Sequence, residues 1–347
     1  MDTSFAFLGL TVHAYGLCAA AAALLLLVPM GLLGRRNGLP AGTVRMFGLL
    51  GIALGVVGAR AVYCVFNLPA FLETYENPWL MLRFFDGGLA MPGLLAGLAL
   101  AAVLAARLMK AQPGALLDVM CVPMGLMLAA LRFGEQFTDL GVGKAVEEGW
   151  LTAAAPWLFE QSRMGVAMEY RLNVWAYEAA AGIVLFAATL LAYLWLRGRR
   201  EARPGDTALC FFSLYGASQT LLESMRDDGH MMIVFLRIGQ VAAALCVLIA
   251  CGVWLARYTR ICGRANARVW LTVGGMILYV AGVALLEFSL DGRLTFGAPS
   301  LARDYGLMAA LCGMAAALAC SLMVALNRRL YRESALAQAP RNESVGG

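Results

Sequence analysis

Charged residues are scarce in this chain of 347 residues: 14% are charged, whereas 61% are hydrophobic. A soluble globular domain has about 25% charged residues. The mean hydropathy of +0.73 indicates more apolar surface than one soluble core can bury. The composition therefore predicts a membrane protein with several spans. It excludes a soluble enzyme, a disordered regulator and a disulfide-rich secreted scaffold.

None of the nine cysteines belongs to a CxxC pair, and nearly all lie inside apolar runs. There a thiol behaves as a small hydrophobic side chain, so we expect neither a disulfide framework nor a metal site, and no other cofactor. The first ten residues contain no basic residue, which argues against a cleaved signal peptide. The net charge of +5 does not indicate a nucleic-acid partner, because the basic residues cluster in short loops between apolar runs.

Apolar runs of membrane-spanning length follow one another along the chain. A helix needs about 20 mostly apolar residues to cross the hydrocarbon core. We therefore expect an all-α polytopic membrane protein with about nine transmembrane helices. Their approximate positions are 12–34, 47–68, 87–109, 115–134, 173–196, 207–226, 231–256, 269–290 and 303–326.

Basic residues gather on one side of these spans. They lie at 35–45, 107–110, 197–203, 257–268 and 328–341. Because positively charged loops stay in the cytoplasm, this pattern predicts an N-terminus outside the membrane and a C-terminus inside.

Polar and ionisable residues inside the spans gather near the predicted outer ends. A charge at the bilayer centre costs about 2.5–3.5 kcal/mol on insertion scales, so each one needs a partner or a wet cavity. Four arginines and three glutamates would make a net-positive cavity, which suits an anion with an apolar body, such as a phospholipid. The alternative is that each arginine pairs singly with a glutamate between helices or reaches the headgroups. The residues expected to converge are Arg60, Arg132, Glu135, Tyr177, Glu178, Glu223, Arg226, Arg237 and Gln240.

Asp118 is separate from this group. It lies nearly four helical turns, about 21 Å, before Arg132, so the two side chains share a helix face without touching. Asp118 lies near the predicted cytoplasmic end of its span. We expect it to have a structural role there, as a negative charge at a helix N-terminus that faces the headgroups.

Short motifs recur in order between residues 12 and 260. Together they resemble the prolipoprotein diacylglyceryl transferase family, enzymes of the bacterial inner membrane. The spacing of Asp118 and Arg132 also matches. The segments that carry the resemblance are HAYGL (13–17), GARAVYCVF (58–66), ENPW (76–79), GGLAMPGLLAG (87–97), RFGEQFTDLGVGK (132–144), Tyr177-Glu178, LYGASQTLLESMRDD (214–228) and RIGQ (237–240).

The resemblance implies a seven-helix membrane domain over residues 1–262. Two additional helices in 263–330 and a disordered cytoplasmic tail in 331–347 would follow it. It also implies a multi-pass protein of the bacterial inner membrane.

The chain departs from the family pattern at five places. Pro92 stands where the family has a histidine, and Gln219 where it has an arginine. Glu135 replaces an asparagine, Leu140 replaces a glutamate, and Leu172-Asn173 replaces a His-Pro pair.

By resemblance, the protein would move diacylglyceryl from phosphatidylglycerol to the lipobox cysteine of a preprolipoprotein signal peptide. Arg132 would hold the phosphate, Glu135 would act as the base, and Tyr15 would donate a hydrogen bond. His13 is the alternative base. Phosphatidylglycerol would bind at Arg60, Arg132, Gly143, Tyr177, Glu178, Glu223, Arg226, Arg237 and Gln240.

The sequence leaves two other functions open. A homologue that binds phospholipid or lipoprotein without transfer is favoured by Pro92 and Gln219. A lipid or peptide transporter is less favoured, because polar residues are scarce in the inner half of the spans apart from Asp118.

The orientation predicts the side from which position 199 is accessible. In a cysteine-free background, Arg199→Cys should react with an impermeant thiol reagent only from the cytoplasmic side. Labelling from the outside would contradict the predicted orientation.

Overall fold

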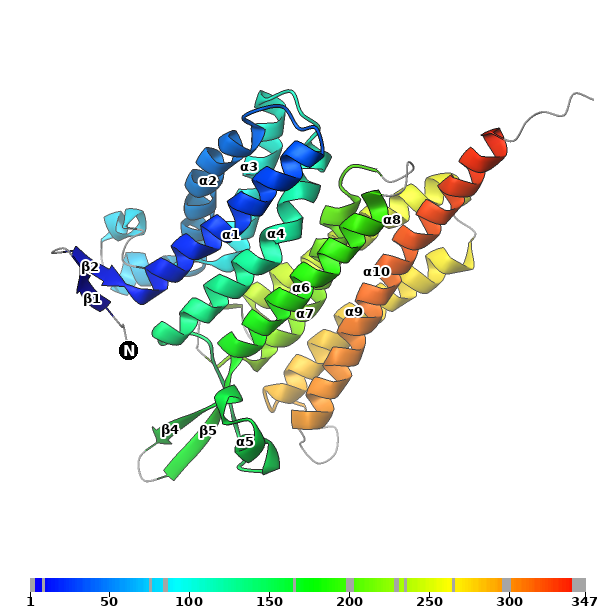
Figure 1. Cartoon of the computed structure of the whole chain (residues 1–347). Coiled ribbons are helices and arrows are strands. Elements are labelled where there is room, and N and C mark those ends of the chain that lie inside the picture. The colour runs from blue at the N-terminus through cyan, green and yellow to red at the C-terminus, as the bar shows by residue number, and fades with distance from the viewer. Residues whose placement is uncertain are drawn as a thin grey trace, which may run out of the picture.

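The protein is described by a computed structural model that covers residues 4–7, 10–74, 77–83, 87–164, 167–197, 203–227, 231–233, 236–263, 266–294 and 301–338. Long helices lying side by side form most of it (Figure 1). Eight of the described helices are long and apolar enough to cross a membrane, and the more polar α7 (Asp206–Met225) lies among them. The eight are α1 (Ala14–Arg36), α2 (Thr43–Phe66), α3 (Met91–Leu108), α4 (Pro113–Gly134), α6 (Val174–Arg197), α8 (Ile238–Cys262), α9 (Ala267–Leu290) and α10 (Leu301–Gln338).

This architecture confirms the predicted all-α polytopic class, and most helix ends agree with the predicted spans within a few residues. The largest difference is the end of α10, expected at residue 326 and found at Gln338. The start of α8, expected at residue 231, lies at Ile238. A short hairpin of β6 (Met232–Ile233) and β7 (Leu236–Arg237) occupies the chain before it. Helix α10 continues past residue 330, and the predicted tail from 339 onwards lies outside the described residues. The orientation in the membrane stays a prediction.

Short strands and turns gather at one end of the bundle, the lower end in Figure 1. We call it the strand end. It carries the hairpin β1 (Ser4–Phe7) and β2 (Leu10–His13), the short helix α5 (Trp150–Ala154), and an antiparallel sheet with strand order β3-β5-β4. The strands of this sheet are β3 (Val142–Val146), β4 (Phe159–Met164) and β5 (Ala167–Asn173).

Two apolar cores hold the helices together. The first lies around α4, whose Leu116, Met120 and Met124 are fully buried against α1, α3 and α7. The second joins α7 and α8 to the last two helices through Trp254 and Tyr279. Helix α7 contributes side chains to both cores. Its sequence is too polar to face lipid, and the position between the two cores covers it with other helices.

Glycines bring α4 and α6 into backbone contact about one to two helical turns from Arg132 and Glu178, on the side away from the strand end. A Cβ at Gly125 would lie 2.6 Å from the carbonyl oxygen of Gly182, so neither position has room for a side chain. Small residues permit such close approach between membrane helices. The contact sets the distance between the helices that carry Arg132 and Glu178.

Asp118 has a structural role, as predicted, but at a different helix end. Its carboxylate accepts hydrogen bonds from the backbone N–H of Gly205 at 2.7 Å and of Ala208 at 2.9 Å. These N–H groups begin α7 and have no partner within their own helix. Asp118 therefore caps α7 from α4 instead of facing the headgroups.

This cap predicts a measurable loss of stability. Asp118→Ala leaves the two N–H groups without their acceptor, which costs about 1–3 kcal/mol for each buried group left unsatisfied. The unfolding midpoint of the detergent-solubilised protein should fall, and Asp118→Asn, which keeps one acceptor oxygen, should lose less. An unchanged midpoint in Asp118→Ala would contradict the capping role.

Candidate active site

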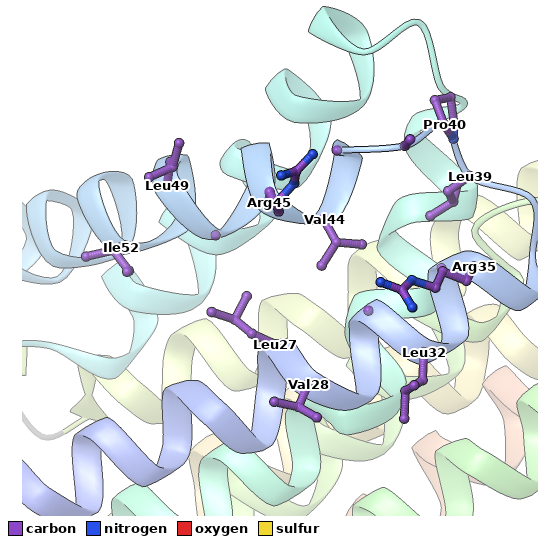
Figure 2. Close-up of a pocket in the computed structure, with 15 residues that line it drawn as sticks. Leu27, Val28, Leu32, Arg35, Leu39, Pro40, Val44, Arg45, Leu49 and Ile52 are labelled. Atoms are coloured by element: carbon purple, nitrogen blue, oxygen red, sulfur yellow. The ribbon is translucent and has the colours of Figure 1, made fainter.

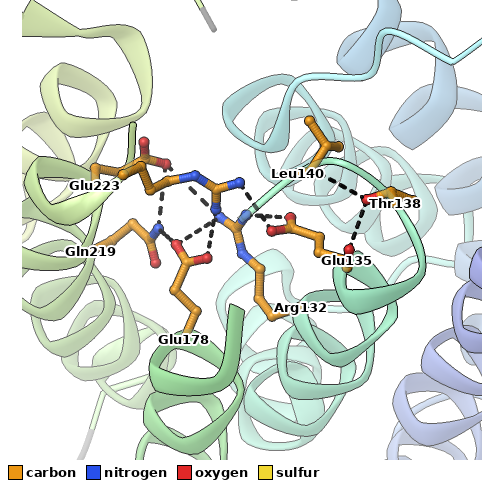
Figure 3. A network of polar contacts seen from close by, with 8 residues as sticks. Arg132, Glu135, Thr138, Leu140, Glu178, Gln219 and Glu223 are labelled. Atoms are coloured by element: carbon orange, nitrogen blue, oxygen red, sulfur yellow. Dashed lines mark hydrogen bonds and ion pairs between the residues drawn. The ribbon is translucent and has the colours of Figure 1, made fainter. Parts of the chain in front are cut away.

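Four charged side chains meet at the strand end in a ring of alternating charge. Figure 3 labels three of them, Arg132, Glu135 and Glu178. Arg132 comes from the last turn of α4, Glu178 from the first part of α6, and Arg226 directly follows α7. Glu135 lies in a short 3-10 turn after α4. All four are less than 7% exposed.

Each guanidinium of the ring contacts both carboxylates. Arg132 Nη1 lies 2.6 Å from Glu135 Oε1, and its Nη2 lies 3.3 Å from Glu178 Oε1. Arg226 Nη1 lies 2.6 Å from Glu178 Oε2, and its Nη2 lies 3.0 Å from Glu135 Oε2. The charges therefore balance within the ring, which compensates in part for taking them out of water.

Gln219 and Glu223 extend the ring along α7. Gln219 Nε2 donates to Glu178 Oε1 and, at 3.3 Å, to Glu223 Oε1. Glu223 Oε1 also lies 3.9 Å from Arg132 Nη2, the longest of these contacts. A Cβ at position 239 would lie 2.3 Å from the same oxygen, so Gly239 of α8 leaves the space that Glu223 occupies.

Arg237 joins the group from the other side of Arg226. Its Nη2 donates to the carbonyl oxygen of Arg226 at 2.6 Å. The structure therefore brings together three arginines and three glutamates, whereas the sequence predicted four arginines with three glutamates.

Arg60 is the predicted arginine that the structure does not bring into the ring. Its guanidinium donates to the carbonyl oxygens of Met81, Leu80 and Gly87 at 2.6–2.9 Å and lies over the rings of Tyr63 and Phe71. These contacts hold the segment between α2 and α3 against the end of α2. The sequence predicts that a charged residue such as Arg60 needs polar partners inside a span. It does not predict that backbone carbonyl oxygens of the following loop are those partners.

Gly143 lies beside the ring, and two further glycines shape its surroundings. Gly143 of β3 forms a backbone bridge with Arg226. Gly141 has φ +78°, and a Cβ there would lie 3.0 Å from Glu135 Oε2. Tyr177 precedes Glu178 in α6 and is half-buried. A Cβ at Gly134 would lie 3.1 Å from the ring of Tyr15.

Two apolar cavities lie on either side of α3. One, of about 280 Å³, runs between α1, α2, α3 and α4 and includes Tyr15 in its lining. The other, of about 340 Å³, lies between α3, α7 and α8 and is lined in part by Pro92 and Tyr215. The space beside Arg132 and Gln219 measures only about 10 Å³, about the least that one water molecule needs. A phosphate group therefore does not fit there unless a neighbouring side chain moves.

The two helices beyond the family resemblance also contact the site region. Gln240 of α8 donates to Glu287 of α9 at 2.6 Å and to the carbonyl oxygen of Thr220 at 3.2 Å. The Tyr279 hydroxyl of α9 lies 2.8 Å from Thr220 Oγ1. Our sequence reasoning missed Glu287, although an acid near the outer end of a predicted span was a usable signal. Outside the spans, burial lowers the pKa of Lys144 in β3, and nearby Glu287 opposes this effect.

The ring predicts a large stability effect at Glu178. Glu178→Ala removes a partner from both guanidinium groups, and breaking a buried pair in this way costs about 3–5 kcal/mol. The unfolding midpoint in detergent should fall strongly. Glu169→Ala is the control, because its pair with Arg171 is partly exposed and worth about 0–1 kcal/mol. Equal unfolding midpoints for the two variants would show that the ring does not stabilise the fold more than a surface ion pair does.

The amino-acid sequence of this chain matches a known protein family. The sequence model of the prolipoprotein diacylglyceryl transferases matches residues 3–256, which leaves out α9 and α10.

Curated relatives carry the name phosphatidylglycerol–prolipoprotein diacylglyceryl transferase. The relative from Symbiobacterium thermophilum is 28% identical over 241 residues, or 69% of this chain and 86% of the relative. The relative from Bacillus licheniformis is 28% identical over 259 residues, or 75% and 92%. One from Streptococcus pyogenes is 24% identical over 241 residues, or 69% and 88%. Because the family model matches more than half of the chain, this multi-pass membrane protein belongs to the prolipoprotein diacylglyceryl transferase family.

Proposed function

We propose that the protein transfers diacylglyceryl from phosphatidylglycerol to the lipobox cysteine of a preprolipoprotein signal peptide. The cysteine sulfur attacks the glyceryl carbon bonded to the phosphate oxygen and forms a thioether. The carbon–oxygen bond breaks, and glycerol phosphate leaves with the electron pair. The observation that carries the proposal is the ring of Arg132 and Arg226 beside an apolar cavity that reaches Tyr15.

Arg132 and Arg226 are proposed to hold the phosphate as it leaves. Their planar guanidinium groups match the geometry of phosphate oxygens, and a low-dielectric site strengthens the attraction. Both share the same two glutamates, so a phosphate can replace a carboxylate without leaving either arginine unpaired. This makes Arg226 the best candidate to replace the family arginine absent at Gln219, because Arg60 and Arg237 donate to backbone carbonyl oxygens.

Glu135 is proposed as the group that accepts the thiol proton. In the ring, both of its oxygens contact guanidinium groups. A phosphate that takes over these guanidinium contacts frees the carboxylate at the place where the thiol must be deprotonated. Tyr15, which lines the cavity close by, would donate a hydrogen bond to a glyceryl or phosphate oxygen.

We propose that the transferase domain comprises residues 1–262 and that the helices in 263–330 support it. Glu287 fixes the amide of Gln240, and Tyr279 contacts Thr220 of α7. The added helices thereby hold α7 and α8, which carry Glu223 and Gln240.

Binding of phospholipid or lipoprotein without transfer is the second candidate function. It is favoured by the closed ring, by Gln219 in place of an arginine and by Pro92 in place of a histidine. Gln219→Arg combined with Pro92→His separates the two candidates. If the natural protein is inert and this variant gains lipidation, the protein is a binding homologue.

Lipidation of a lipobox peptide in phosphatidylglycerol vesicles tests the proposed reaction. Wild type should form the thioether, and Arg132→Ala should lose on the order of a hundredfold to a thousandfold in rate. Arg132→Lys should recover part of the rate, because it keeps the charge but loses the bidentate fork. Full activity of Arg132→Ala would show that the phosphate is held elsewhere.

A further inference from the structure

A lateral groove separates α1 from α2 at the end of the bundle opposite the strand end (Figure 2). Its volume is about 1170 Å³. Leu27, Val28 and Leu32 of α1 line one wall, and Leu49 and Ile52 of α2 line the other.

Two arginines lie at the end of this groove. Arg35 comes from the last turn of α1 and Arg45 from the first turn of α2. In the part of the chain that the structure describes, no carboxylate forms an ion pair with either guanidinium. Two described acids near this end are already engaged, because Asp118 caps α7 and Asp206 pairs with Arg257. No carboxylate of the described residues therefore compensates the positive charge of the groove.

The apolar walls face outward as well as into the groove. Val28, Leu32, Leu49 and Ile52 are each 58–71% exposed, which places hydrocarbon surface where the bilayer surrounds the helices. Cations at the end of an apolar groove match a molecule with an anionic head and a hydrocarbon body. A peptide segment would leave backbone polar groups unsatisfied against these walls.

The groove adjoins the apolar cavity that reaches Tyr15. Leu27, Gly48 and Ile52 line both spaces. A hydrocarbon chain in the groove would therefore press against the wall of that cavity.

We propose that this groove binds one anionic phospholipid. Its phosphate contacts Arg35 and Arg45, and its acyl chains lie between α1 and α2. Arginine forks pair with phosphate oxygens, and each basic residue near an anionic membrane surface adds binding energy. This lipid is separate from the proposed substrate, because the groove lies at the other end of α1 from Tyr15. It would set the spacing of α1 and α2, and so the width of the cavity between them.

Native mass spectrometry of the full-length protein, titrated with phosphatidylglycerol, tests the proposal. Arg35→Gln with Arg45→Gln should lose one retained lipid, with affinity for it weakened on the order of tenfold or more. The matched control is Arg36→Gln with Arg107→Gln, which removes the same charge at the same end but outside the groove lining, and it should retain the lipid. Lysine at both 35 and 45 should restore part of the binding. Without added lipid the unfolding midpoint should be unchanged, because neither arginine has an ion-pair partner to lose among the described residues.

Equal retention by the groove variant and the control would overturn the proposal. So would equal retention of phosphatidylcholine by wild type, because the groove would then select hydrocarbon and not the anionic head. A phosphatidylglycerol with a photoreactive acyl chain should label α1 and α2 near Val28 and Leu49, and labelling confined to other helices would also overturn it. These readouts do not depend on transfer, since an inert protein still binds the lipid.

Discussion

The burial of Arg132, Glu135, Glu178 and Arg226 is the constraint on which the strand end depends. None of these charges can face hydrocarbon at acceptable cost, and each guanidinium is satisfied only when α4, α6 and α7 approach closely. The contact of Gly125 with Gly182 permits that approach, and Asp118 fixes the other end of α7. The polar ring and the glycine contacts therefore act as one unit that places α7 in the middle of the bundle.

The same ring limits what can bind beside it. With about 10 Å³ beside Arg132, a phosphate has no room unless a side chain moves, and in the proposed reaction it exchanges with a carboxylate. That exchange would keep the charge of both arginines compensated and would release Glu135 for the proton of a thiol. The loss of the family arginine at Gln219 is consistent with this arrangement, because Arg226 already contacts the two glutamates that Arg132 contacts.

Much of this was predictable from the sequence, because burying a charge in a membrane is costly enough to imply a partner. That rule predicted the convergence of Arg132, Glu178 and Arg226. It also placed Arg60 in the cavity, whereas the structure pairs Arg60 with loop carbonyls. Such carbonyls carry no sequence signal, since any residue supplies one. Glu287 was missed because it lies beyond the family resemblance, and its contact with Gln240 depends on how α9 packs.

We propose that Arg132 and Arg226 exchange a carboxylate for the phosphate of phosphatidylglycerol. Solid-state NMR distances between lipid phosphorus and arginine side-chain nitrogens, in the full-length protein in phosphatidylglycerol bilayers, test this exchange most directly. Arg132→Lys and Arg226→Lys would assign the signals. We expect close phosphorus–nitrogen contacts, each of which disappears when its arginine is replaced. Contacts that survive both substitutions, or no contact at either arginine, would contradict it.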